Sequence, residues 1–314
     1  MANSSWAQQT TARFFSGRNS PSQRQCDEIA QTISGASTVS LVDSPGSMSY
    51  TVVCSGLPSP RKDLIVSFRE SGAVIDEEIV KLAKEVHGDL VPESTYHGNV
   101  EGADPPLFIY SMPRLRGSSY IDVLPFRAEM DSDERDKHAV FIKHLARPQL
   151  ASRQAQAEQQ EEIRRRLTRL MEELPSSSLL YSTVSKLIEC LPSLFSQNYP
   201  QALTHNDFSV TNILIDENTF EIMGIVDWSL ATVMPFGMGL DIIFLATGFM
   251  TRDGWHNYAR KQLLQDTFWE EIMNLAQTAG RIGAVLRLAF RRNADGSPSE
   301  EVSMSESKTK QLIA

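Results

Sequence analysis

Two carboxylates and one amide stand at the ends of short apolar runs within residues 203–229. A first apolar run leads into the segment that carries Asp207 and Asn212, a second run follows directly, and a third, after a turn signal, ends near Asp227. Short apolar runs that are separated by a turn predict paired β-strands. The sequence therefore predicts a rigid strand pair that presents Asp207, Asn212 and Asp227 close together.

This set of side chains meets the requirements of phosphoryl transfer from a nucleotide. One Asp takes the proton of an attacking hydroxyl, while an Asn and a second Asp hold Mg²⁺ on the phosphates. The spacing His205-x-Asp207-x-x-x-x-Asn212, with apolar residues before Asp227, is specific when order, spacing and strand context agree. The alternative is that the Asp residues only cap turns, as isolated Asp residues often do. The order and the spacing favour a phosphotransferase of the kinase-like fold.

In these residues the chain resembles the aminoglycoside phosphotransferase / choline kinase family, whose catalytic and metal loops read H-x-D-x-x-x-x-N and I-x-D-W. The resemblance implies that Asp207 is the catalytic base and that Asn212 and Asp227 are the metal ligands. It also implies that His205 buttresses the loop. Protein kinases have Phe-Gly where this chain has Trp228 and a serine, so the small-molecule branch is favoured.

The resemblance extends over most of residues 38–292 and implies an α+β protein with a bilobal protein-kinase-like fold. Such a fold has an antiparallel-sheet N-lobe and a mostly helical C-lobe. The expected organisation is an N-terminal nucleotide-binding lobe with its hinge at 1–117 and a helical C-terminal catalytic lobe at 118–292. Residues 293–314 are expected to form a disordered tail, because they contain too few apolar residues to pack.

Apolar periodicity predicts the individual elements. Strands are expected over 38–43, 49–57, 64–68, 95–97 and 107–111 in the first lobe. A helix with Pro21 at its first position is expected to end at Gly35, and another is expected to end at Gly88. In the second lobe, helices are expected over 132–146, 151–174, 179–196, 240–251, 253–279 and 281–292. Asp241 is expected to cap a helix or to brace the catalytic loop.

The first lobe offers candidate nucleotide contacts. In kinase-like enzymes a basic side chain on the third strand contacts the phosphates and pairs with a Glu on the next helix, which points to Arg69 and Glu78. The alternative is that Arg69 is an ordinary charge at the end of a strand. Glu78 would then be a first-turn residue whose negative charge interacts favourably with the helix dipole. Ser47 lies in the position of the phosphate-covering loop, although a plain turn is equally compatible with its single glycine. By position in the family, Ser111 and Met112 belong to the connector that receives the adenine edge.

The resemblance implies an ATP-dependent phosphotransferase that uses Mg²⁺ and moves the γ-phosphate to a hydroxyl, or less readily an amine, of a small molecule. Three alternatives stay open. They are a catalytically silent kinase-like module that binds or regulates a partner, a protein kinase of the same fold, and an enzyme that phosphorylates a hydroxyl only to eliminate it. The acceptor, the choice between ATP and GTP, and the oligomeric state are not determined by the sequence.

Bulk properties exclude several other classes. A net charge of −9 argues against a general nucleic-acid binder, and the basic cluster at 164–169 is flanked by glutamates within 158–162 and at 172–173, as on a solvated helix. No apolar run approaches the roughly 18–20 residues that cross a membrane, and the N-terminus lacks the apolar centre of a secretory signal. Cys26, Cys54 and Cys190 are too far apart to suggest a disulfide framework or a zinc site. Buried free thiols and a cytoplasmic location are therefore expected.

Overall fold

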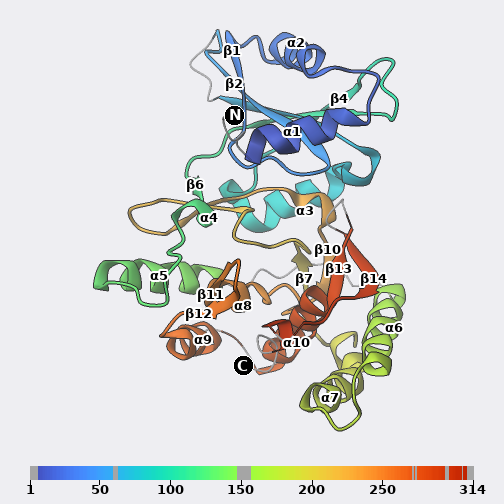
Figure 1. Cartoon of the computed structure of the whole chain (residues 1–314), viewed down its shortest axis with the longest axis vertical. Coiled ribbons are helices and arrows are strands. Elements are labelled where there is room, and N and C mark those ends of the chain that lie inside the picture. The colour runs from blue at the N-terminus through green and yellow to red at the C-terminus, as the bar shows by residue number, and fades with distance from the viewer. Residues whose placement is uncertain are drawn as a thin grey trace. The chain divides into compact units, whose positions relative to one another are not determined.

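The computed structural model describes residues 6–58, 63–146, 157–270, 272, 274–293, 297–305 and 307–309 (Figure 1). The chain divides into two compact units, Met1–Arg116 and Gly117–Ala314. An antiparallel sheet dominates the first unit, and most of the helices belong to the second. The predicted α+β kinase-like class is therefore confirmed. Within the described residues, no helix is both long enough and apolar enough to cross a membrane.

The first unit is built on a five-stranded antiparallel sheet with the order β1-β2-β3-β5-β4. Its strands are β1 (Thr38–Leu41), β2 (Ser49–Ser55), β3 (Leu64–Arg69), β4 (Thr95–Asn99) and β5 (Phe108–Pro113). All five match predicted strands to within two residues at each end. Helices α1 (Trp6–Ser16) and α2 (Gln23–Ser34) pack against the sheet through Phe14, Cys26 and Ala30. The apolar core of this unit therefore lies between these two helices and one face of the sheet.

The ends of the first-unit helices follow their capping residues. Ser22 caps α2 and forms a capping box with Gln25, so the helix begins at Gln23. The sequence had predicted Pro21 at the first position of this helix, which is wrong by two residues. The predicted stop at Gly35 is confirmed, because this glycine adopts the left-handed conformation at the C-cap. Helix α3 (Glu77–His87) begins after Asp76, whose carboxylate accepts hydrogen bonds from two backbone N–H groups. Helix α1 was not predicted.

The second unit contains seven helices among its described residues. They are α4 (Tyr120–Val123), α5 (Ser132–Leu145), α6 (Ala157–Glu173), α7 (Leu179–Leu194), α8 (Ile242–Ala246), α9 (Lys261–Glu270) and α10 (Asn274–Ala289). One apolar cluster joins α6, α7 and α10, and a second joins α5, α8 and α9. Of the helix predicted over 151–174, the first residues lie outside the described part of the chain.

Small antiparallel sheets complete the described part of the second unit: β6-β8-β9 has three strands, and β10-β7, β11-β12 and β13-β14 have two each. They are formed by β6 (Ser118–Ser119), β7 (Gln201–Thr204), β8 (Ile213–Ile215), β9 (Ile222–Ile225), β10 (Thr232–Pro235), β11 (Gly248–Thr251), β12 (Gly254–Asn257), β13 (Phe290–Arg292) and β14 (Pro298–Val302). The pairs β8–β9 and β7–β10 frame the segment that carries Asp207.

The helices predicted over 240–251 and 253–279 are wrong in their extent. Helix α8 ends at Ala246, and a hairpin of β11 and β12 separates it from α9. Gly248 explains the strand pairing, since a Cβ there would lie 2.4 Å from the backbone oxygen of His256. Gly254 has a φ of +119° and begins β12 directly after the two-residue turn, Arg252 and Asp253. The sequence pattern was apolar enough for a helix, but these glycines favour a tight hairpin.

The tail also differs from the prediction over its described residues. Instead of being disordered, the chain forms β14, which pairs with β13. Val302 and Met304 pack against the apolar cluster of α6, α7 and α10. Glu300 forms ion pairs with Arg165 and Arg169 of α6. A few apolar and charged contacts therefore suffice to fix a segment of low average hydrophobicity.

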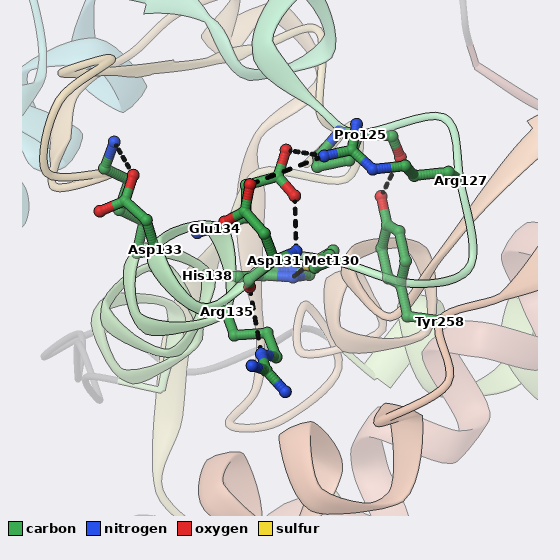
Figure 2. A network of polar contacts seen from close by, with 10 residues as sticks. Pro125, Arg127, Met130, Asp131, Asp133, Glu134, Arg135, His138 and Tyr258 are labelled. Carbon is green, nitrogen blue, oxygen red and sulfur yellow. Dashed lines mark hydrogen bonds and ion pairs between the residues drawn. The ribbon is translucent and has the colours of Figure 1, made fainter.

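Helix α5 carries a polar network around a buried histidine (Figure 2). Asp131 and Glu134 form the capping box that begins the helix, and Glu134 also pairs with Arg127. His138 is fully buried, and its Nε2 lies 2.8 Å from the backbone oxygen of Ala246. A pocket beside this network is lined by Met130, Arg135, His138, Tyr258, Leu263 and Leu264, among others, and by none of the predicted site residues.

The three cysteines are free, as predicted. Cys26 and Cys54 are buried, and burial raises the pKa of the Cys26 thiol to about 12. Cys190 is exposed on α7, so the expectation that all three thiols are buried is wrong for this residue.

Candidate active site

The predicted strand pair around the candidate site is present. Strands β8 and β9 pair with Ile213 opposite Ile225, so Asn212 and Asp227 lie at the same end of the hairpin. Asp207 lies in the loop between β7 and β8. The sequence therefore predicted correctly that short strands present these three residues.

Asn212 links the Asp207 loop to the strand that leads to Asp227. Its Nδ2 donates hydrogen bonds to the Asp207 backbone oxygen at 2.9 Å and to Asp207 Oδ2 at 3.2 Å. Its own backbone oxygen accepts a hydrogen bond from the N–H of Val226 at 3.0 Å, directly before Asp227. The Asp207 side chain is 34% exposed. The carboxylate of Asp207 is thus fixed by Asn212 and still open to a reaction partner.

Two residues of the site have a left-handed backbone. Asn206 has a φ of +60° and Asp227 a φ of +63°, which are uncommon for residues other than glycine. Asn206 Nδ2 donates to the backbone oxygen of Leu230 at 2.9 Å. Ser229 Oγ donates to Asp227 Oδ1 at 3.0 Å. Such conformations cost about 1–3 kcal/mol and cluster at functional sites, where the surrounding contacts hold them.

His205 has the buttressing position that the family resemblance implied. It is buried, and its Nε2–H donates to the backbone oxygen of Val226 at 2.8 Å. Its ring lies against the indole of Trp228, with the ring centroids 4.7 Å apart. Burial lowers the pKa of His205, so the ring stays neutral and keeps this hydrogen-bond pattern at neutral pH. His205 therefore ties the Asp207 loop to the strand that precedes Asp227.

Sequence reasoning missed Arg287, a residue of α10. Its Nη2 lies 3.7 Å from Asp207 Oδ1, and its Nη1 lies 3.4 Å from Asp241 Oδ2. Asp241 is the first residue before α8, but its side chain makes no capping hydrogen bond there. Of the two predicted roles for Asp241, the contacts support the brace. No local pattern could have identified Arg287, because its partners come from other parts of the chain.

Arg69 and Glu78 lie in the first unit, at the predicted positions. Arg69 ends β3 and is buried, with Nε 3.2 Å from Ser67 Oγ and Nη1 3.2 Å from the backbone oxygen of Ala73. Glu78 is in the first turn of α3, and its backbone N–H donates to Asp76 Oδ1 at 2.9 Å. Their pairing and their contact with phosphates stay predictions.

The remaining first-unit candidates also stay predictions in their roles. Ser47 is exposed in the loop that joins β1 to β2. The strand predicted to end at Ser111 continues to Pro113, so both Ser111 and Met112 lie within β5 rather than in a connector after it. Ser111 Oγ lies 2.7 Å from Nε2 of His97 on β4.

Oxygen atoms suited to a hard cation are present in the Asp207 cluster. The Asn212 hydrogen bonds to Asp207 use the amide nitrogen, so its amide oxygen lies on the other side of the group. Asp227 contributes a carboxylate at the end of the neighbouring strand. In the described ranges, no group of three or more His, Cys, Asp or Glu side chains is arranged to hold a metal ion. The donor set fits an ion such as Mg²⁺, which takes one or two carboxylates and shares its remaining ligands with phosphates and water.

Several solved structures share the fold of this chain. A phosphotransferase described as a putative aminoglycoside phosphotransferase from Ralstonia eutropha JMP134 aligns with 14% identity over 93% of this chain and 94% of its own, with a TM-score of 0.50. The GDP complex of a mutant aminoglycoside 2'-phosphotransferase-IIIa aligns with 15% identity over 85% of this chain and 90% of its own, with a TM-score of 0.51. At these identities the likeness shows the fold.

A third structure is the amicoumacin kinase hAmiN in complex with AMP-PNP, Ca²⁺ and Ami, which aligns with 11% identity over 93% of this chain and 91% of its own, with a TM-score of 0.51. No curated protein sequence matches the chain significantly. The family model APH, described as the phosphotransferase enzyme family, matches residues 86–270, which is more than half of the chain. The matched range contains Asp207, Asn212 and Asp227. The chain belongs to the phosphotransferase enzyme family.

Proposed function

We propose that this small-molecule phosphotransferase moves the γ-phosphate of ATP to a hydroxyl group of its acceptor, with Asp207 as the catalytic base. One observation carries the proposal: Asn212 binds Asp207 through its side chain and the strand before Asp227 through its backbone. These contacts support the proposal, because phosphoryl transfer needs a base and two oxygen ligands of a metal ion close together.

Asp207 is proposed to orient the acceptor hydroxyl and to take its proton. Its side chain is partly exposed, so a bound hydroxyl can reach it, while the Asn212 amide prevents the carboxylate from rotating freely. Because the transition state of phosphoryl transfer is loose, correct positioning contributes more than the strength of the base. A carboxylate held in this way suits that task.

Asn212 and Asp227 are proposed to hold Mg²⁺ through the amide oxygen and the carboxylate. When bound, the ion would neutralise the charge on the phosphate oxygens. Ser229 donates a hydrogen bond to Asp227 Oδ1, which limits the rotation of that carboxylate. The presence of AMP-PNP and Ca²⁺ in the amicoumacin kinase complex, a structure of the same fold, agrees with a nucleotide and a divalent cation as partners.

The nucleotide contacts in the first unit are proposals of the same kind. Arg69 is proposed to contact the phosphates, since its contacts with Ser67 and Ala73 fix the guanidinium group. Glu78 is proposed as its partner, Ser47 as a further phosphate contact, and the backbone of Ser111 and Met112 as the adenine contact. We also propose that the protein works in the cytoplasm, where ATP and free thiols are both maintained.

The test is transfer of labelled γ-phosphate from ATP, and separately from GTP, to a panel of aminoglycosides, amino alcohols and hydroxylated secondary metabolites. Asp207→Ala should lower transfer by about 10²–10⁴-fold, because general-base catalysis typically contributes that much, while ATP affinity stays near the wild-type value. Asp253→Ala, a change of an exposed Asp outside the cluster, is the matched control and should keep full activity.

Full transfer by Asp207→Ala would show that this residue is not the base. If labelled phosphate appears on protein substrates instead of small molecules, the chain is a protein kinase. If the wild-type protein neither binds ATP nor transfers phosphate, the silent binding module becomes the better account. Analysis of the products separates simple phosphorylation from phosphorylation followed by elimination.

A further inference from the structure

The carboxylate of Asp207 is contacted on both of its oxygens. Oδ2 accepts a hydrogen bond from Asn212 Nδ2 at 3.2 Å, and Oδ1 faces Arg287 Nη2 at 3.7 Å. Asn212 belongs to the H-x-D-x-x-x-x-N pattern that the family shares. Arg287 does not, because it lies beyond the matched residues 86–270.

The geometry of Arg287 suits a residue that orients Asp207 without saturating it. A distance of 3.7 Å is too long for a good hydrogen bond but within the range of an ion pair. Oδ1 of Asp207 therefore keeps its capacity to accept a hydrogen bond from another group. The other end of the guanidinium pairs with the buried Asp241, and the Arg287 side chain is only 14% exposed. Arg287 is thus held in place between two carboxylates, where screening by water is weak.

Close packing of α10 brings Arg287 to this place. A Cβ on Gly283 would lie 2.0 Å from the backbone oxygen of Met238, so this glycine allows the helix to approach the segment before α8. Gly283 and Arg287 are four residues apart and lie on the same face of the helix. After α10, Arg292 Nη2 donates to the backbone oxygen of Asn206 at 3.1 Å. The segment from Gly283 to Arg292 therefore contacts the catalytic loop at two neighbouring residues.

We propose that Arg287 is a positioning residue, which holds the Asp207 carboxylate so that Oδ1 receives the proton of the acceptor hydroxyl. The proposal rests on the proposed function, since it assumes that Asp207 is the base. In the transfer step, a bond forms between the acceptor oxygen and the γ-phosphorus, and the bond between the γ-phosphorus and the bridging oxygen of ADP breaks. The hydroxyl proton moves to Asp207 Oδ1, and ADP leaves with the bridging oxygen.

Three variants test this role. Arg287→Met removes the charge and keeps the length of the side chain, Arg287→Lys keeps the charge, and Arg281→Met is a matched control at an exposed position of the same helix. The first measurement is hydrogen exchange of the backbone amides over residues 205–212, under conditions where circular dichroism shows each variant to be folded. The second is kcat, together with KM for ATP, using the best acceptor from the panel described above.

We expect faster exchange over 205–212 in Arg287→Met than in Arg281→Met. We expect kcat to fall by about 10–100-fold, as for a misplaced catalytic group, with KM for ATP changed by less than about threefold. Arg287→Lys should recover part of kcat, because the positive charge remains beside Asp207. Arg281→Met should match the wild type in both measurements.

Unchanged exchange over 205–212 in Arg287→Met would overturn the positioning role, whatever the activity. Faster exchange with an unchanged kcat would also overturn it, because the loop would then be held for stability alone. A higher KM for ATP with an unchanged kcat would place Arg287 in nucleotide binding instead. If Arg287→Lys has a kcat as low as that of Arg287→Met, the positive charge is not what positions Asp207. If the wild type transfers no phosphate, the proposed function fails, and hydrogen exchange still decides whether Arg287 holds the loop.

Discussion

Individual side chains of the candidate site are held mainly by backbone carbonyl groups. His205 donates to Val226, Asn206 donates to Leu230, and Asn212 donates to the backbone of Asp207. None of these bonds requires an ionised partner, so they persist when neighbouring carboxylates change their charge. We therefore expect the loop to keep its conformation during the proposed proton transfer to Asp207. Arg287 adds the charged contact that the neutral ones do not supply.

A second buried histidine, His138, makes stability depend on pH. Burial lowers its pKa from 6.5 to about 4, so the folded protein keeps the ring neutral at a pH where the unfolded chain protonates it. The unfolded state therefore binds more protons between pH 6.5 and 4. The contribution of His138 is fully present above pH 6.5 and is lost as the pH falls through this window. Between pH 7 and pH 5 the expected loss in unfolding free energy is about 2 kcal/mol.

Urea unfolding at pH 7 and pH 5 checks this expectation on the wild type and on His138→Gln. The Gln side chain keeps an N–H donor for the Ala246 carbonyl but does not titrate, so the difference between the two pH values should shrink by about 2 kcal/mol. His256→Gln changes an exposed histidine and should keep the wild-type difference. Equal pH dependence in His138→Gln and the wild type would show that His138 does not cause the loss of stability at low pH.

At the scale of elements, the packing of α10 depends on the absence of a Cβ at Gly283. In a helix interior Gly→Ala normally stabilises by about 0.5–1 kcal/mol, because alanine loses less backbone entropy on folding. Gly283→Ala should do the opposite and lower the unfolding free energy by more than about 1 kcal/mol, since the new Cβ would lie 2.0 Å from the Met238 backbone oxygen. Because the helix must shift, kcat should also fall through the displacement of Arg287.

Gly280→Ala on the same helix provides the comparison. The new Cβ would lie 3.2 Å from a ring carbon of Trp269 and 3.3 Å from the backbone oxygen of Gly237, contacts that shifts of a few tenths of an ångström relieve. Chemical denaturation should therefore give Gly283→Ala a much lower unfolding free energy than Gly280→Ala. The unfolding free energy of Gly280→Ala should stay within about 1 kcal/mol of the wild-type value. A Gly283→Ala protein as stable as the wild type would show that α10 is not seated by this close approach.

Elements with clear local signals were predicted well, and those determined by distant contacts were not. The strands of the first sheet alternate or run apolar, so their bounds follow from the sequence to within two residues. Residues 242–250 are mostly apolar, which does not distinguish a continued helix from the first strand of the β11–β12 hairpin. Only the close backbone approach at Gly248 decides between them.

Across the whole molecule, the fold class and the core of the site follow from one short segment. Asp207, Asn212 and Asp227 lie near one another in sequence, and the short strands between them fix their spacing. The contacts that complete the second unit join residues far apart in the chain, such as Arg165 and Glu300, which are 135 residues apart. A single sequence contains no signal for such pairs, and so Arg287 and the β13–β14 hairpin were missed.

The most direct test of the account is calorimetric titration of ATP, with and without Mg²⁺, into the wild type, Asp227→Asn and the control Asp253→Asn. We expect Mg²⁺ to strengthen ATP binding by the wild type and the control. Asp227→Asn should lose most of this gain, about tenfold or more in affinity, because the ion loses a charged ligand. The same Mg²⁺-dependent affinity in Asp227→Asn, or no ATP binding by the wild type, would contradict the account.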